Sequence, residues 1–168
     1  MTVRPVEGWV VSVVLPDVQG VLWWGSDDHD VDVVAATGGR PLVWASTDQC
    51  LQDVGARGWP AAEREPMMFD LRPVVAWLQG RRLVLDAATA LNTWNFAGDL
   101  AATAGVRWSD RGRLADVCFD KLTMANVPWL AGLDQYRPRW TGRQHTYLRH
   151  RLAEAVAVVR GQLLLGRS

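Results

Sequence analysis

The sequence predicts an α+β fold in which an antiparallel N-terminal β-meander of four or five strands packs against four or five helices. Short runs rich in β-branched residues, separated by turn residues, fill residues 1–70. Apolar residues at helical spacing, preceded by capping residues, fill residues 71–168. No linker, repeat or low-complexity tract separates the two parts, so we expect a single domain over residues 1–168.

The first part contains four stretches with the composition of short β-strands. They cover residues 8–15, 20–24, 31–37 and 41–45. The pairs Pro16-Asp17 and Gly38-Gly39 favour tight turns, so consecutive strands are expected to lie side by side as a meander. The run at residues 67–71 is the candidate for a fifth strand.

Five helices are expected, each marked by a start signal, a stop signal or apolar spacing. The first follows Ser46 and stops at Gly55 or Gly58, the second runs from Pro73 to near Gly80, the third from Asp86 to about Ala104, the fourth over residues 111–125, and the last follows Thr141. Ser46, Asp86 and Thr141 can each accept a hydrogen bond from an amide of the first turn. The third helix is apolar on two sides, so we place it at the centre of the fold.

Composition limits where the protein works. The 168 residues are 49% hydrophobic and 21% charged, which is typical of a globular chain with a proper core. Neither a long apolar stretch nor a signal-peptide pattern occurs, so we expect a soluble cytoplasmic protein without a membrane partner. The two cysteines, Cys50 and Cys118, lie far apart without metal-binding spacing, so we expect reduced thiols.

No self-contained catalytic, cofactor or metal motif is present. No serine lies in a nucleophile-elbow sequence, and no glycines form a phosphate-binding loop. We therefore expect no enzyme activity, no cofactor and no metal ion. Asn92, Asn95 and Asp99 form a polar stripe on the third helix, which is either a set of structural hydrogen-bonding groups, the commoner role, or part of an active site.

The densest group of ionisable side chains surrounds His29. It lacks the glycine and the distal glutamate of an EF-hand calcium loop, which makes a metal ion the least expected of three interpretations. The others are a solvated loop and an acidic patch that docks a basic protein. Under the docking interpretation, the partner-binding residues are Trp24, Asp27, Asp28, Asp30 and Asp32.

Charge is unevenly distributed, although the formal net charge is zero. Residues 1–60 carry eight acidic and three basic side chains, whereas residues 111–168 carry ten basic and four acidic ones. With ten tryptophans, this split favours a specific protein-binding surface. Nucleic-acid binding would depend on Arg143, Arg149 and Arg151, but because the whole chain is not basic we do not expect a nucleic-acid partner.

Three short motifs carry a resemblance to a known family. They are Trp94-Asn95-Phe96-Ala97-Gly98-Asp99-Leu100, Phe119-Asp120-Lys121-Leu122 and Asn126-Val127-Pro128. Over residues 30–160 the set resembles small actinobacterial immunity proteins of polymorphic-toxin systems, such as contact-dependent growth inhibition. An arginine-rich composition typical of GC-rich genomes agrees with such a source. The sequence departs from the pattern at Thr123-Met124-Ala125, where another aromatic residue is expected.

The resemblance implies a binding function rather than a reaction. A protein of this kind neutralises a cognate secreted or contact-delivered toxin, here expected to be a nuclease, by covering the active site of its C-terminal toxin domain. Two alternatives stay open: an enzyme with an unrecognised active site, and a regulatory nucleic-acid-binding protein.

Overall fold

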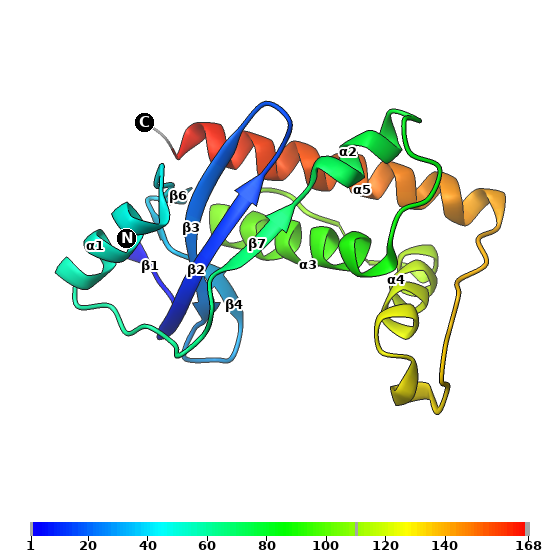
Figure 1. Ribbon diagram of the computed structural model, residues 1–168, viewed down its shortest axis with the longest axis horizontal. Coiled ribbons are helices and arrows are strands. Elements are labelled where there is room, and N and C mark those ends of the chain that lie inside the picture. The colour runs from blue at the N-terminus through cyan, green and yellow to red at the C-terminus, as the bar shows by residue number, and fades with distance from the viewer. Residues whose placement is uncertain (1, 110, 167–168) are drawn as a thin grey trace.

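The computed structural model describes residues 2–109 and 111–166, and it confirms the α+β class. In chain order the elements are β1 (Thr2–Val3), β2 (Glu7–Val14), β3 (Gln19–Ser26), β4 (Asp32–Val34), β5 (Ala36–Thr37), β6 (Arg40–Pro41), α1 (Thr47–Ala56), β7 (Met67–Asp70), α2 (Arg72–Leu78), α3 (Ala87–Ala104), α4 (Arg113–Asn126), the 3₁₀ helix η1 (Pro128–Ala131) and α5 (Gly142–Leu165). In Figure 1 the main sheet stands between α1 and the pair formed by α3 and α5. Within the described ranges, every helix is too short or too polar to cross a lipid bilayer.

The main sheet has the strand order β4-β3-β2-β7. β2 and β3 form an antiparallel hairpin in which Glu7 lies opposite Ser26, and β4 pairs with β3 in the same antiparallel sense. β7 pairs with β2 in the parallel sense, with Val11 opposite Met67. A second sheet joins β1, β5 and β6.

Side chains alternate between the two faces of the main sheet, because successive residues of a strand point in opposite directions. Val11 and Val13 of β2 belong to the larger core, together with buried residues of α3 and α5. Val10 and Trp23 belong to a smaller cluster with Cys50 of α1. Helices therefore cover both faces of the sheet, and α3 lies against the face that carries the larger core.

One strand prediction is wrong, and a second strand is present but pairs differently from the expected meander. Of residues 41–45, only Pro41 lies in a strand, and Trp44 makes an isolated bridge to Val21. Pro41 has no backbone N–H, so it cannot donate to a continuing ladder. The strand predicted at residues 67–71 exists as β7, but it is parallel to β2 because the chain first crosses through α1. The N-terminal strands therefore form two sheets instead of one antiparallel meander.

The helix predictions are confirmed, and their start signals act as expected. Ser46 accepts a hydrogen bond from the Gln49 amide (3.2 Å), and Asp86 accepts one from the Thr89 amide (2.8 Å). Thr141 opens α5 with a capping box. α3 ends at Gly105, whose φ of 65° is in the left-handed region that favours glycine. The helix that carries the Asn92, Asn95 and Asp99 stripe is thus fixed at both ends by its own sequence.

Candidate functional site

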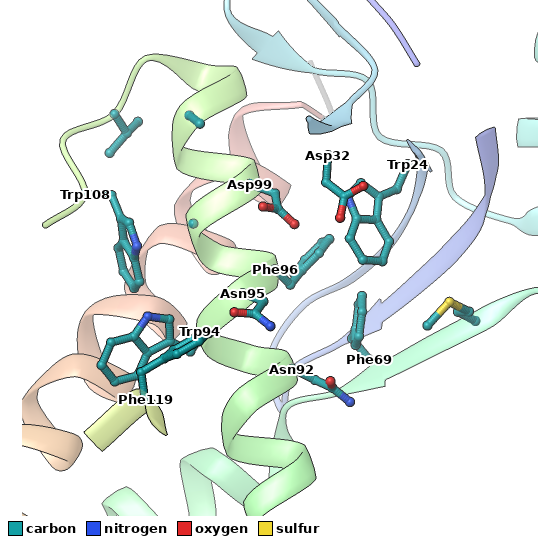
Figure 2. Close-up of a pocket in the computed structure, with 14 residues that line it drawn as sticks. Trp24, Asp32, Phe69, Asn92, Trp94, Asn95, Phe96, Asp99, Trp108 and Phe119 are labelled. Carbon is teal, nitrogen blue, oxygen red and sulfur yellow. The ribbon is translucent and has the colours of Figure 1, made fainter. Parts of the chain in front are cut away.

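A cavity of about 570 Å³ lies along the partly exposed side of α3, and we call it the α3 cavity. Its lining combines two carboxylates, two side-chain amides and six aromatic rings. The lining residues are Trp24, Asp32, Met67, Phe69, Asn92, Trp94, Asn95, Phe96, Gly98, Asp99, Ala102, Val106, Trp108 and Phe119. Figure 2 shows that α3 runs through the middle of this surface, with β-sheet residues on one side and Trp108 with Phe119 on the other. The lining contains no basic side chain.

The polar stripe of α3 forms the centre of the cavity. Asn92, Asn95 and Asp99 follow one another at intervals of three and four residues, which places them on one side of a helix. Asn92 and Asn95 are exposed and Asp99 is half-buried. Within residues 2–109 and 111–166, none of these three side chains makes a hydrogen bond. The interpretation in which they tie down loop backbone therefore finds no support in their contacts.

Asp32 reaches the cavity from the start of β4. Its backbone pairs with Ser26 of β3, and Ser26 Oγ donates a hydrogen bond to Asp32 Oδ1 (2.9 Å). β4 is fixed along α3 because the backbone amide of Val34 donates to Thr103 Oγ1 (3.1 Å). Thr103 lies one helical turn beyond Asp99, so this bond holds β4 where both Asp32 and Asp99 line the cavity. In Figure 2 the two carboxylates lie facing one another beside Trp24.

The electrostatics of the pair follow from this position. Burial raises the pKa of Asp99 to about 7, and the negative charge of Asp32 adds to the rise. No basic side chain in the lining offsets the two negative charges. Near neutral pH the Asp99 carboxyl therefore exchanges between its protonated and ionised forms, and a cation in the cavity would favour the ionised form.

Aromatic rings form the wall on the sheet side. Trp24 packs edge-on against Trp9 (ring centroids 5.3 Å apart), Phe69 (5.6 Å) and Phe96 (5.9 Å). Its indole nitrogen is buried and has no hydrogen-bond partner in the described part of the chain. Because Phe96 is a core residue, this wall is held rigidly against α3.

The opposite wall depends on a glycine. A Cβ at Gly98 would lie 3.2 Å from Trp108 Nε1, so the absent side chain lets Trp108 lie close against α3. The guanidinium carbon of Arg151 lies 4.8 Å from the centre of the Trp108 ring, which fixes that ring in a cation–π contact. No local pattern marked Trp108 as a site residue, because it follows the end of α3 in an irregular segment.

The predicted partner-binding residues divide into two groups. Trp24 and Asp32 line the α3 cavity, where Trp24 is half-buried. Asp27, Asp28 and Asp30 lie in the turn between β3 and β4. From the sequence, Asp32 was grouped with the acidic turn, and Asp99 was assigned to a separate polar stripe. Only the contact between β4 and α3 places the two carboxylates in one cavity.

The turn itself is stabilised from within. Asp27 Oδ1 accepts hydrogen bonds from the backbone amides of His29 (2.8 Å) and Val31 (3.0 Å). These bonds hold the pKa of Asp27 below its usual range. Asp30 adopts a φ of 58°, which aspartate tolerates better than most residues.

The same turn contains the one candidate metal group in the described ranges. Ligand atoms of Asp27, Asp28 and His29 lie within 4.8 Å of one another. However, Asp27 is already engaged with backbone amides, and His29 Nδ1 lies 2.7 Å from Asp28 Oδ1. The group is explained by turn structure, so it adds nothing to the case for a metal ion.

Two of the three arginines considered for nucleic-acid binding have structural contacts. Arg149 donates hydrogen bonds to the carbonyl oxygens of Trp77 (3.1 Å) and Leu78, which joins α5 to α2. Arg151 is not available for phosphate binding either, because the residue is 6% exposed and its Nη1 lies 2.9 Å from Glu154 Oε2. The side of α5 that carries Arg151 is therefore covered, since Trp94 and Trp108 pack over the Arg151 guanidinium.

Comparisons with known proteins do not extend this description. No protein-family model, curated protein or solved structure matches the chain.

Proposed function

We propose that this protein is an immunity protein, which binds a cognate protein toxin and neutralises it by covering the toxin's active site. The observation that carries the proposal is the composition of the α3 cavity, which presents two carboxylates and a wall of aromatic rings without a basic side chain. Asp32 directly follows the acidic turn, so negative charge continues from the cavity to the surface.

A face of this composition suits a basic protein surface. A nuclease toxin contacts nucleic acid through basic side chains, because phosphate binding depends on them. Opposed charge speeds the encounter of two proteins and selects the correct partner. Aromatic side chains supply the apolar contacts that dominate interface energies. The side-chain amides of Asn92 and Asn95 have no hydrogen-bond partner in the described part of the chain, so they are available for hydrogen bonds across an interface.

Co-expression with the product of the adjacent gene tests the proposal. We expect the wild-type protein to restore growth of cells that express that product, and the two proteins to copurify. A double variant, Asp32→Asn with Asp99→Asn, should lose both effects. Asp48→Asn is the matched control, because Asp48 is exposed on α1 beyond the opposite face of the sheet. The proposal would be contradicted if the product of the adjacent gene did not inhibit growth. It would also be contradicted if the double variant protected cells as well as Asp48→Asn does.

A second candidate function rests on the pKa of Asp99. A carboxylic acid that titrates near pH 7 beside a second carboxylate is an arrangement that general acid–base catalysis uses, for example in the hydrolysis of glycosides. This candidate predicts turnover of a chromogenic glycoside, ester or phosphoester, with a rate that changes around pH 7. Asp99→Asn should abolish that turnover without lowering the Tm. Equal rates for wild type and Asp99→Asn would exclude it.

A further inference from the structure

The α3 cavity has the features of a receptor for one planar organic cation. We propose that it binds the guanidinium group of an arginine side chain, held between the carboxylates of Asp32 and Asp99 with one face against Trp24. This inference rests on the proposed function, and it adds the chemical group that the partner inserts.

Charge is the first reason. Two carboxylates from separate elements line the same cavity, and none of the described residues that line it is basic. Burial raises the pKa of Asp99, and the negative charge of Asp32 adds to the rise, because like charges disfavour each other. Elsewhere in the described chain, the acidic groups Asp53 and Asp70 lie beside their own arginines, Arg57 and Arg72. Asp32 and Asp99 have no such cation among the residues that the structure describes, so an incoming cation would supply it.

Shape and aromatic character are the second reason. Ammonium groups and metal ions are compact and strongly hydrated, whereas guanidinium is planar, weakly hydrated and stacks on rings. The protein already uses this contact twice next to the cavity: Arg64 lies 4.5 Å from the Trp9 ring centre and Arg151 lies 4.8 Å from that of Trp108. Trp24 packs against Trp9 and lines the cavity itself. An arginine entering beside Trp24 would therefore meet a third ring of the same kind.

Hydrogen-bonding capacity is the third reason. Guanidinium has five N–H donors and no acceptor, so it needs several converging oxygen atoms. The carboxylates of Asp32 and Asp99 and the amide oxygen of Asn95 provide them, and Asn95 and Asp99 make no hydrogen bond within the described ranges. Charge-assisted bonds of this kind are about twice as strong as neutral ones. The lining thus supplies charge, a ring face and acceptors for the same group.

The test uses N-acetyl-arginine amide as the probe, with N-acetyl-citrulline amide as an uncharged control of the same shape. Binding is followed by NMR through the side-chain amide signal of Asn95 and the indole signal of Trp24, which Trp24→Phe identifies. We expect a saturable shift of both signals with the arginine compound and none with citrulline amide. Asp99→Asn should weaken binding about tenfold or more, and Asp48→Asn, on the exposed side of α1, should leave it unchanged. A lysine amide should bind more weakly than arginine amide.

Several outcomes would overturn the inference. Equal shifts with arginine and citrulline amides would show that charge is irrelevant, and saturable shifts with Mg²⁺ or Ca²⁺ alone would identify a metal site instead. The absence of a shift with the arginine compound would also overturn it. None of these results bears on growth rescue or copurification, which test the immunity function. Conversely, arginine binding without any growth rescue would support the guanidinium site and contradict the proposed immunity function.

Discussion

The protein carries two groups of acidic residues that are opposite in character, one in an exposed turn and one in the α3 cavity. In the turn between β3 and β4, Asp27 is satisfied by two backbone amides and its pKa is lowered. In the α3 cavity, Asp99 has no hydrogen bond within the described residues and its pKa is raised to about 7. Hydrogen bonds stabilise the charge of the first group, whereas burial and a second carboxylate destabilise the charge of the other.

This contrast separates structural charge from available charge. A carboxylate that accepts backbone hydrogen bonds holds a turn in shape, and it has little left to offer a partner. A half-buried carboxylate without partners costs stability, so its retention in a cavity is a reason to assign it a binding role. The turn acids that are not engaged, Asp28 and Asp30, remain exposed and act over longer distances.

The largest expected effect is on the proposed complex with a protein toxin. Asp99→Ala leaves a partner's cation buried without its counterion, which costs about 2 kcal/mol or more and acts mainly on the dissociation rate. Surface plasmon resonance with the immobilised toxin measures this rate. An unchanged dissociation rate would mean that the cavity lies outside the interface.

The second effect is on the free protein and has the opposite sign. The folded-state pKa of Asp99 is about 7, above the unfolded value of about 3.9. Its contribution to stability is therefore fully present below pH 4 and is lost as the pH rises through 7. Asp99→Asn should be more stable than wild type at pH 8 by about 2 kcal/mol, after allowance for solvent screening at a half-buried site.

Urea unfolding at pH 5 and pH 8 measures this difference. The gain should be largest at pH 8 and much smaller at pH 5, where Asp99 is protonated in the folded protein. Asp32 is the other titratable group in the cavity lining, and its charge helps to raise the pKa of Asp99. The Asp32→Asn variant should therefore lose stability at a lower pH than the wild type does. A loss of stability in Asp99→Asn at pH 8 would mean that the carboxylate is structural.

The sequence predicts those parts of the fold that depend on neighbouring residues. The caps at Ser46, Asp86 and Thr141 were found because capping involves residues only a few positions apart. The parallel pairing of β7 with β2 was missed, because pairing depends on the path that the chain takes through α1. The burial of Arg151 was not predicted for a similar reason, since helical periodicity does not reveal that a second side of α5 is covered.

The candidate site was predictable only in pieces. Asp32 belonged to a visible acidic run, and Asp99 belonged to a visible polar stripe. Their meeting depends on the bond from Val34 to Thr103, which joins distant parts of the chain. No local pattern encodes that contact, so the pair with the shifted pKa appears only in three dimensions.

The third expected effect is on the association rate, and it comes from the exposed acidic residues of the turn between β3 and β4. Asp28→Lys with Asp30→Asn should lower the association rate with the toxin by about tenfold at low salt, because steering depends on long-range charge. Asparagine is chosen at position 30 because it tolerates the positive φ. Stopped-flow measurements at low and high salt should give rates that converge as salt screens the charges. A change confined to the dissociation rate would place the turn inside the contact instead.

The smallest expected effect is a change in Tm at Asp27, whose carboxylate has a structural role in the turn. Asp27→Ala removes the acceptor for the His29 and Val31 amides, so the turn should loosen and the Tm should fall slightly. Asp28→Ala is the matched control, because Asp28 accepts no backbone hydrogen bond in the described chain and should leave the Tm unchanged. Asp27→Asn keeps an acceptor oxygen and should restore most of the loss. If Asp27→Asn instead reduced toxin binding as strongly as Asp99→Ala, negative charge at Asp27 would matter more than its hydrogen bonds, and the division between structural and available charge would fail.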